Sequence, residues 1–74
     1  FGPDGAEQVH RGLGRLSREQ REVLVLRFLE EMSYDDIARV VGCQVGTIRS
    51  RLHYAKQALR TILEQDFAQR GTLP

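Results

Sequence analysis

The chain has 74 residues, of which 41% are hydrophobic and 28% charged, and its formal net charge is +1. These values fit one small soluble domain and rule out a disordered tail and a membrane span. One cysteine and two histidines also rule out a disulfide scaffold and a structural zinc site, so we expect a cytoplasmic domain without metal or cofactor. Because residue 1 is Phe rather than Met, we expect a piece of a longer protein.

Three pairs of residues have the spacing of a helix N-terminal cap and a partner three positions later. They are Asp4 with Glu7, Ser17 with Gln20, and Ser33 with Asp36. Gly42 stands where a residue that tolerates left-handed backbone geometry would end the third helix. With the spacing of apolar residues, these signals predict four helices near residues 5–14, 18–31, 34–41 and 45–66, and no strand.

The predicted fold is all-α, a small bundle of about four helices that contains a helix-turn-helix and a long C-terminal recognition helix. We expect residues 1–4 to be a linker or a remnant, residues 5–66 to form the domain, and residues 67–74 to be a flexible tail. Six apolar residues of the last helix are three or four positions apart, which places them on one stripe that we expect to be buried. They are Val45, Ile48, Leu52, Ala55, Leu59 and Ile62.

Charge is distributed unevenly along the chain. Residues 1–36 hold eight acidic and five basic residues, whereas residues 37–63 hold five basic residues and no acidic one. An acid-free stretch of this kind indicates a surface that faces a polyanion, and a solvated cationic helix face is the simpler alternative. The bases are concentrated on the helix that would enter the major groove, which favours DNA binding by the helix-turn-helix in residues 33–52.

Three stretches of the chain resemble region 4 of bacterial sigma factors, and most closely that of the extracytoplasmic-function (ECF) group. Residues 21–27 and 32–38 are similar to the first half of that region, and residues 45–52, Val-Gly-Thr-Ile-Arg-Ser-Arg-Leu, to its second half. The resemblance runs from Leu16 to Leu63. It implies binding to the −35 promoter element within RNA polymerase holoenzyme, contact with the β-subunit flap of core RNA polymerase, and inhibition by an anti-sigma factor.

Candidate site residues are assigned from their chemistry and their place on the recognition helix. We expect base contacts from Arg49, Ser50, His53 and Tyr54, because an arginine can hold guanine through two hydrogen bonds and its neighbours can reach adjoining base edges. We expect phosphate contacts from Ser33, Tyr34, Gly46, Thr47, Arg51 and Lys56. No nucleophile stands beside a base, so we expect no enzyme.

Two other functions remain open on the sequence. One is a response-regulator output domain of the quorum-sensing type, although its recognition helix is usually shorter. The other is a helical protein-interaction module that does not bind DNA. Single residues also have simpler interpretations: Arg51 paired with a carboxylate of the second helix, Arg27 paired with Glu31, and Cys43 as core filler. Gln44 replaces the usual Pro or Ser of the family and predicts a poorly capped recognition helix.

Overall fold

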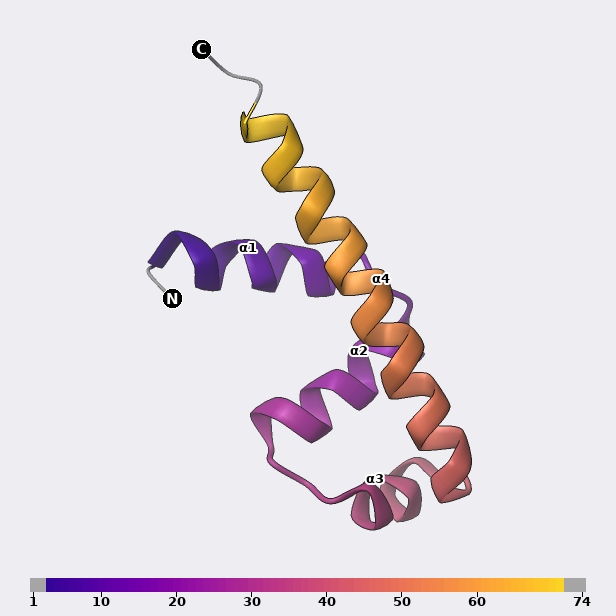
Figure 1. The fold of residues 1–74 in the computed structure, drawn as a ribbon. Coiled ribbons are helices and arrows are strands. Elements are labelled where there is room, and N and C mark those ends of the chain that lie inside the picture. The colour runs from indigo at the N-terminus through magenta and orange to yellow at the C-terminus, as the bar shows by residue number, and fades with distance from the viewer. Residues whose placement is uncertain (1–2, 72–74) are drawn as a thin grey trace.

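A computed structural model of the chain describes residues 3–71, with side chains described from residue 7 to residue 66. It consists of α1 (Pro3–Gly14), α2 (Arg18–Leu24), the π-helical segment η1 (Val25–Leu29), α3 (Tyr34–Val41) and α4 (Val45–Gly71). Figure 1 shows α4 as a long rod, with α2 and α3 beside its N-terminal half and α1 crossing it further along. The expected all-α bundle with a helix-turn-helix is confirmed.

Two of the three predicted helix caps are present. Ser17 and Gln20 form a reciprocal capping box at the start of α2, with the Gln20 N–H donating to Ser17 Oγ at 3.2 Å and the Ser17 N–H to Gln20 Oε1 at 3.3 Å. At α3, the Asp36 N–H donates to Ser33 Oγ at 3.1 Å. Each cap satisfies an amide that would otherwise lack a partner at the helix start.

Several predicted boundaries differ from the structure. α1 begins at Pro3, so Asp4 lies inside the helix rather than at its cap, because proline already has the backbone angle of a first helical residue. The predicted helix 18–31 ends at Leu29, and its last turn is π-helical. α4 continues to Gly71, five residues beyond its predicted end and into the range expected to be a tail. Residues 1–2 and 72–74 lie outside the described residues.

The predicted apolar stripe of α4 forms the centre of the core. Ile48 and Ala55 have no exposed surface and Leu52 has 2%, while Val45, Leu59 and Ile62 are half-buried around them. The opposite wall is made of buried residues from α2 and α3. They are Val23, Leu24, Ile37 and Ala38. Because the hydrophobic effect scales with the apolar area removed from water, this seam fixes which side of α4 faces outward.

α1 is held against the C-terminal half of α4 by close approach. A Cβ atom at Gly12 would lie 2.9 Å from Cδ1 of Leu59 and 3.4 Å from Cδ2 of Leu63, so any larger residue at this position would have to displace these leucine side chains. An ion pair between Arg15 and Asp66, 3.3 Å apart, adds to the contact at the end of α1. Gln8 is 4% exposed, and its Nε2 atom has no hydrogen-bond partner among the described residues.

The connection between η1 and α3 is held by Arg27, which does not form the predicted ion pair with Glu31. Its Nη1 atom donates to the backbone oxygen of Met32 at 2.9 Å, and its guanidinium lies over the Tyr34 ring, 4.9 Å from the centroid. The π-helical turn shifts Arg27 away from the position that an α-helical spacing of four residues would give it. Glu31 itself has a left-handed backbone, with φ at 55°. None of the described helices has the length and apolarity needed to cross a bilayer.

Candidate nucleic-acid interface

A short turn delivers the chain from α3 into α4. Gly42 has a φ of 83°, and the N–H groups of Gly42 and Cys43 both donate to the oxygen of Ala38, at 2.8 and 3.0 Å. Gln44 then begins α4 through its backbone oxygen, which accepts from the N–H groups of Thr47 and Ile48 at 3.0 and 3.2 Å. The left-handed glycine is therefore the residue that sets the angle between the two helices.

All four residues predicted to contact bases are exposed on α4. Arg49, Ser50, His53 and Tyr54 project away from the buried seam, and Tyr54 is 62% exposed. The rings of His53 and Tyr54 meet edge to face, with centroids 5.3 Å apart. These residues occupy the first three turns of α4, the part of a recognition helix that enters the major groove in helix-turn-helix proteins.

Three basic residues and one histidine lie along one side of α4, at spacings of four, three and four residues. We call this set the basic strip, and it consists of Arg49, His53, Lys56 and Arg60. The spacing brings successive members together on one helix side. Arg60 is the member in an ion pair, with its Nε atom 2.9 Å from Glu64 Oε1. Arg49 and Lys56 form no ion pair within the described part of the chain.

The six residues predicted to contact phosphates are placed unequally. Gly46, Thr47 and Lys56 are exposed on α4, and a Cβ atom at Gly46 would have no described neighbour beyond the local helix backbone within 4 Å. Arg51 is half-buried, because it lies three residues from Ile48 and four from Ala55 and so borders the seam. No ion pair joins Arg51 to a described residue of α2.

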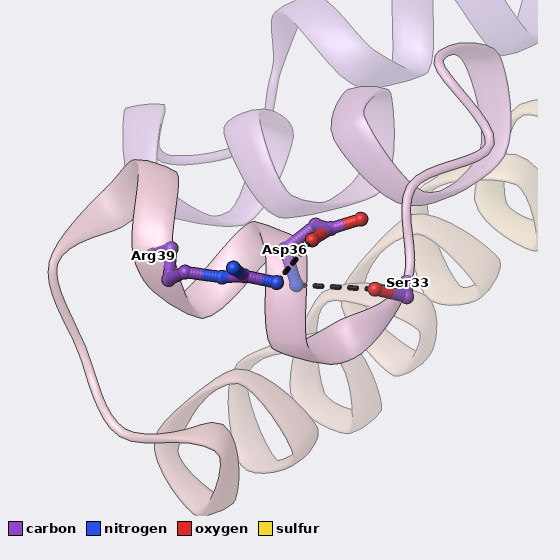
Figure 2. A network of polar contacts seen from close by, with 3 residues as sticks. All are labelled: Ser33, Asp36 and Arg39. Carbon is purple, nitrogen blue, oxygen red and sulfur yellow. Dashed lines mark hydrogen bonds and ion pairs between the residues drawn. The ribbon is translucent and has the colours of Figure 1, made fainter.

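Ser33 and Tyr34, the other two of these residues, lie at the start of α3. Ser33 is exposed and already accepts a hydrogen bond from the Asp36 N–H, while the ring of half-buried Tyr34 is covered by Arg27. Figure 2 shows that the Asp36 carboxylate turns to Arg39, whose Nη2 atom is 2.6 Å from Oδ1. Asp36 therefore does not complete the predicted reciprocal cap, because a nearby guanidinium is a stronger partner than the Ser33 amide.

An apolar groove of about 470 Å³ lies beside the basic strip, between α1, α2, η1 and α4. Its walls include Val9 and Leu13 of α1, and its rim on the α4 side carries Lys56. Two of its lining residues are unusually exposed for their size, with Phe28 at 54% and Leu29 at 69%. Sequence reasoning missed this groove, because the residues that line it are brought together by helix crossing rather than by a motif.

The described residues contain no cluster of His, Cys, Asp or Glu that could hold a metal ion. Cys43 is half-buried and packs against the core, as predicted. The arrangement offers an exposed helix face with hydrogen-bonding and basic groups, held outward by a buried seam.

Comparison with known proteins identifies this arrangement. A family model described as sigma-70, region 4 matches residues 6–59. The chain belongs to the sigma-70 region 4 family. The domain is 40% identical over 63 residues to the ECF RNA polymerase sigma factor EcfG of Rhodopseudomonas palustris, covering 85% of the chain and 35% of that protein. It is 43% identical over 56 residues to the RNA polymerase sigma-H factor of Pseudomonas aeruginosa, covering 76% of the chain and 29% of that protein.

A third relative is the ECF RNA polymerase sigma factor SigC of Mycobacterium tuberculosis, 51% identical over 51 residues, which cover 69% of the chain and 28% of that protein. This region 4 domain therefore spans about a third of the length of these relatives. Their names favour the sigma-factor interpretation over a response-regulator output domain, and the two relatives named as ECF factors place the domain in that group.

Proposed function

We propose that this region 4 domain binds the −35 element of promoters as part of an ECF sigma factor of RNA polymerase in the cytoplasm, without an enzymatic activity of its own. The observation that carries the proposal is the outward face of α4. From Val45 to Leu63 that helix has no acidic residue, and its four candidate base-contacting side chains are all exposed. A face of this kind suits the major groove, which is lined by phosphates and presents hydrogen-bonding base edges.

Arg49 has the central role in this proposal. It lies in the second turn of α4 and forms no ion pair with any side chain that the structure describes, and its guanidinium fork matches the O6 and N7 atoms of guanine. Ser50 and His53 adjoin it and are assigned to neighbouring base edges, directly or through water. Tyr54 presents an amphipathic ring to a thymine methyl group, a sugar or a phosphate.

Phosphate contacts set the register of the domain on DNA. Gly46 and Thr47 lie in the first turn of α4, where the positive end of the helix dipole attracts phosphate. The Thr47 N–H already donates to the Gln44 oxygen, so Thr47 is assigned a phosphate contact through its hydroxyl group. Lys56 adds a phosphate contact further along the helix. Arg51, Ser33 and Tyr34 are proposed as outer contacts, and Arg39 supports Ser33 by neutralising the Asp36 carboxylate beside it.

The test uses duplexes selected from a random pool by the 74-residue chain, with a scrambled duplex of equal length as reference. Arg49→Ala is expected to reduce affinity for the selected duplex about 5- to 150-fold, the equivalent of ~1–3 kcal/mol, with little change on the scrambled one. Arg18→Ala removes the same charge from the exposed start of α2 and serves as the matched control. Equal losses for both variants on both duplexes would contradict the proposed base readout.

The apolar groove favours a second, compatible role in binding protein partners. We propose that its occupants are the β-subunit flap of core RNA polymerase and an anti-sigma factor. An exposed apolar surface of this size is uncommon on a small soluble domain unless a partner covers it. The expected occupant is an amphipathic helix whose apolar residues contact Phe28 and Leu29.

Binding of core RNA polymerase to the immobilised chain tests this role. Leu29→Glu is expected to weaken binding at least tenfold, because the carboxylate would have to leave water when the groove is filled. Val40→Glu is the control, since Val40 is 66% exposed on α3 and does not line the groove. Equal binding by the wild-type chain and Leu29→Glu would exclude the groove as the polymerase contact.

A further inference from the structure

Lys56 lies at the boundary between the basic strip and the apolar groove. Its Nζ atom is 5.2 Å from the centroid of the Phe28 ring, and both residues line the groove. Lys56 is seven residues after Arg49, which places it on the same side of α4, about 10 Å further along the axis. The residue therefore belongs to both surfaces.

The contacts of Lys56 differ from those of Arg60 and Arg39. Arg60 forms an ion pair with Glu64, and Arg39 forms one with Asp36, so each of these guanidinium groups is partly neutralised by a carboxylate. Lys56 has no ion pair among the described residues, and the contact that the structure gives it is the ring face of Phe28. An aromatic face attracts an ammonium group without neutralising it, so the charge and its donors stay available to an anion.

Phe28 is held in place by an uncommon backbone. It lies in η1, where the Glu30 N–H donates to the oxygen of Val25 at 3.0 Å, and the Met32 N–H to that of Leu26 at 3.0 Å. Arg27 locks the following connection by donating to the Met32 oxygen. A π-helical turn holds more residues than an α-helical one, which changes the direction of the side chains within it. Phe28 therefore stays half exposed beside α4 instead of entering the core.

We propose that Phe28 is a positioning residue for DNA binding, and that it holds Lys56 ready for a phosphate at the edge of the major groove. A free lysine side chain samples many rotamers and loses that freedom when it binds. The ring restricts this sampling before DNA arrives, so less entropy is lost in the complex. Phe28 contacts no DNA in this proposal. It lines the groove and affects the basic strip only through its contact with Lys56. The inference rests on the proposed binding of the −35 element.

The experiment is a double-mutant cycle on binding of the 74-residue chain to its selected duplex. Phe28→Leu is expected to weaken binding about two- to fivefold, and Phe28→Tyr, which keeps the ring, is expected to bind like wild type. Lys56→Gln is expected to reduce the slope of log K against log salt by about 0.9. In the Lys56→Gln background, Phe28→Leu is expected to have no further effect, because the residue it positions is gone.

Val40→Ala shortens an apolar side chain on α3 that is 66% exposed, against 54% for Phe28, and controls for general loss of apolar surface, while melting curves control for folding. The inference is overturned if Phe28→Leu weakens DNA binding equally with and without Lys56. It is also overturned if Phe28→Tyr binds DNA as weakly as Phe28→Leu, and in either case Phe28 acts only on the fold. A wild-type chain that prefers no duplex overturns the proposed function as well. If the wild-type chain prefers its selected duplex but the effects of Phe28→Leu and Lys56→Gln on binding are additive, only the positioning role of Phe28 is overturned.

Discussion

The two halves of α4 are supported in different ways. The N-terminal half buries Ile48 and Leu52 against α2 and α3, whose ends are defined by Ser17, Ser33 and Gly42. The C-terminal half meets α1, which places a glycine at the contact and a buried Gln8 amide that has no partner in the described part of the chain. The first half depends on local caps and a filled seam, and the second on the close approach of α1 and one ion pair between Arg15 and Asp66.

This difference separates two tasks within one helix. The half that we propose to read DNA is anchored by buried residues, which fix the side of the helix that faces outward, as recognition of base edges demands. Beside the other half an apolar groove stays open, which is what a protein partner needs. Lys56 and Phe28 stand where the two meet.

The largest effect on stability is expected at the centre of the N-terminal half of α4. Ile48 has no exposed surface, so Ile48→Ala should leave a cavity and reduce the free energy of unfolding by about 2–5 kcal/mol. Val40→Ala, at a residue with 66% exposure, should change it by less than about 0.5 kcal/mol. Urea unfolding measures both. Similar stabilities for the two variants would show that the seam is not the support of this half.

A smaller effect is expected where α1 meets α4. Gly12→Leu should reduce the free energy of unfolding by about 1–3 kcal/mol, because a Cβ there would lie 2.9 Å from Leu59 Cδ1 and the helices would have to separate. Gly14→Leu is the matched control: nothing lies within 4 Å of its Cβ position, and the change should be neutral or stabilising by up to about 1 kcal/mol. Equal losses would contradict the close-approach explanation.

The smallest effect is expected in the connection between η1 and α3. Glu31→Gly should raise the free energy of unfolding by about 0.5–1 kcal/mol, since glycine relieves the left-handed backbone at φ 55° but adds freedom to the unfolded chain. Glu30→Gly, at a residue with φ of −92°, gains no relief and should be destabilising by a similar amount. Thermal unfolding of the two variants would measure the difference. If both substitutions raise the free energy of unfolding, or both lower it, Glu31 is not strained.

Prediction from sequence succeeds where the signal is local. The bounds of α3 follow from Ser33 and Gly42, because a cap and a left-handed glycine act on residues a few positions away. Helical spacing likewise identifies the seam of α4. The errors occur where neighbours decide the outcome: Arg27 turns to Met32 and Tyr34 instead of Glu31, since the π-helical turn alters its direction.

By itself, the sequence determined that α4 has a buried seam and an exposed, acid-free face, because apolar periodicity and charge are properties of a single helix. It also determined the family, through three stretches of residues that lie within the matched range 6–59. Only the tertiary structure decided which distant residues lie together. It places Gly12 beside Leu59, Phe28 beside Lys56, and α1 beside the residues of α2, η1 and α4 that line the groove with it. Such contacts depend on helix crossing and side-chain volume, which no spacing within one element specifies.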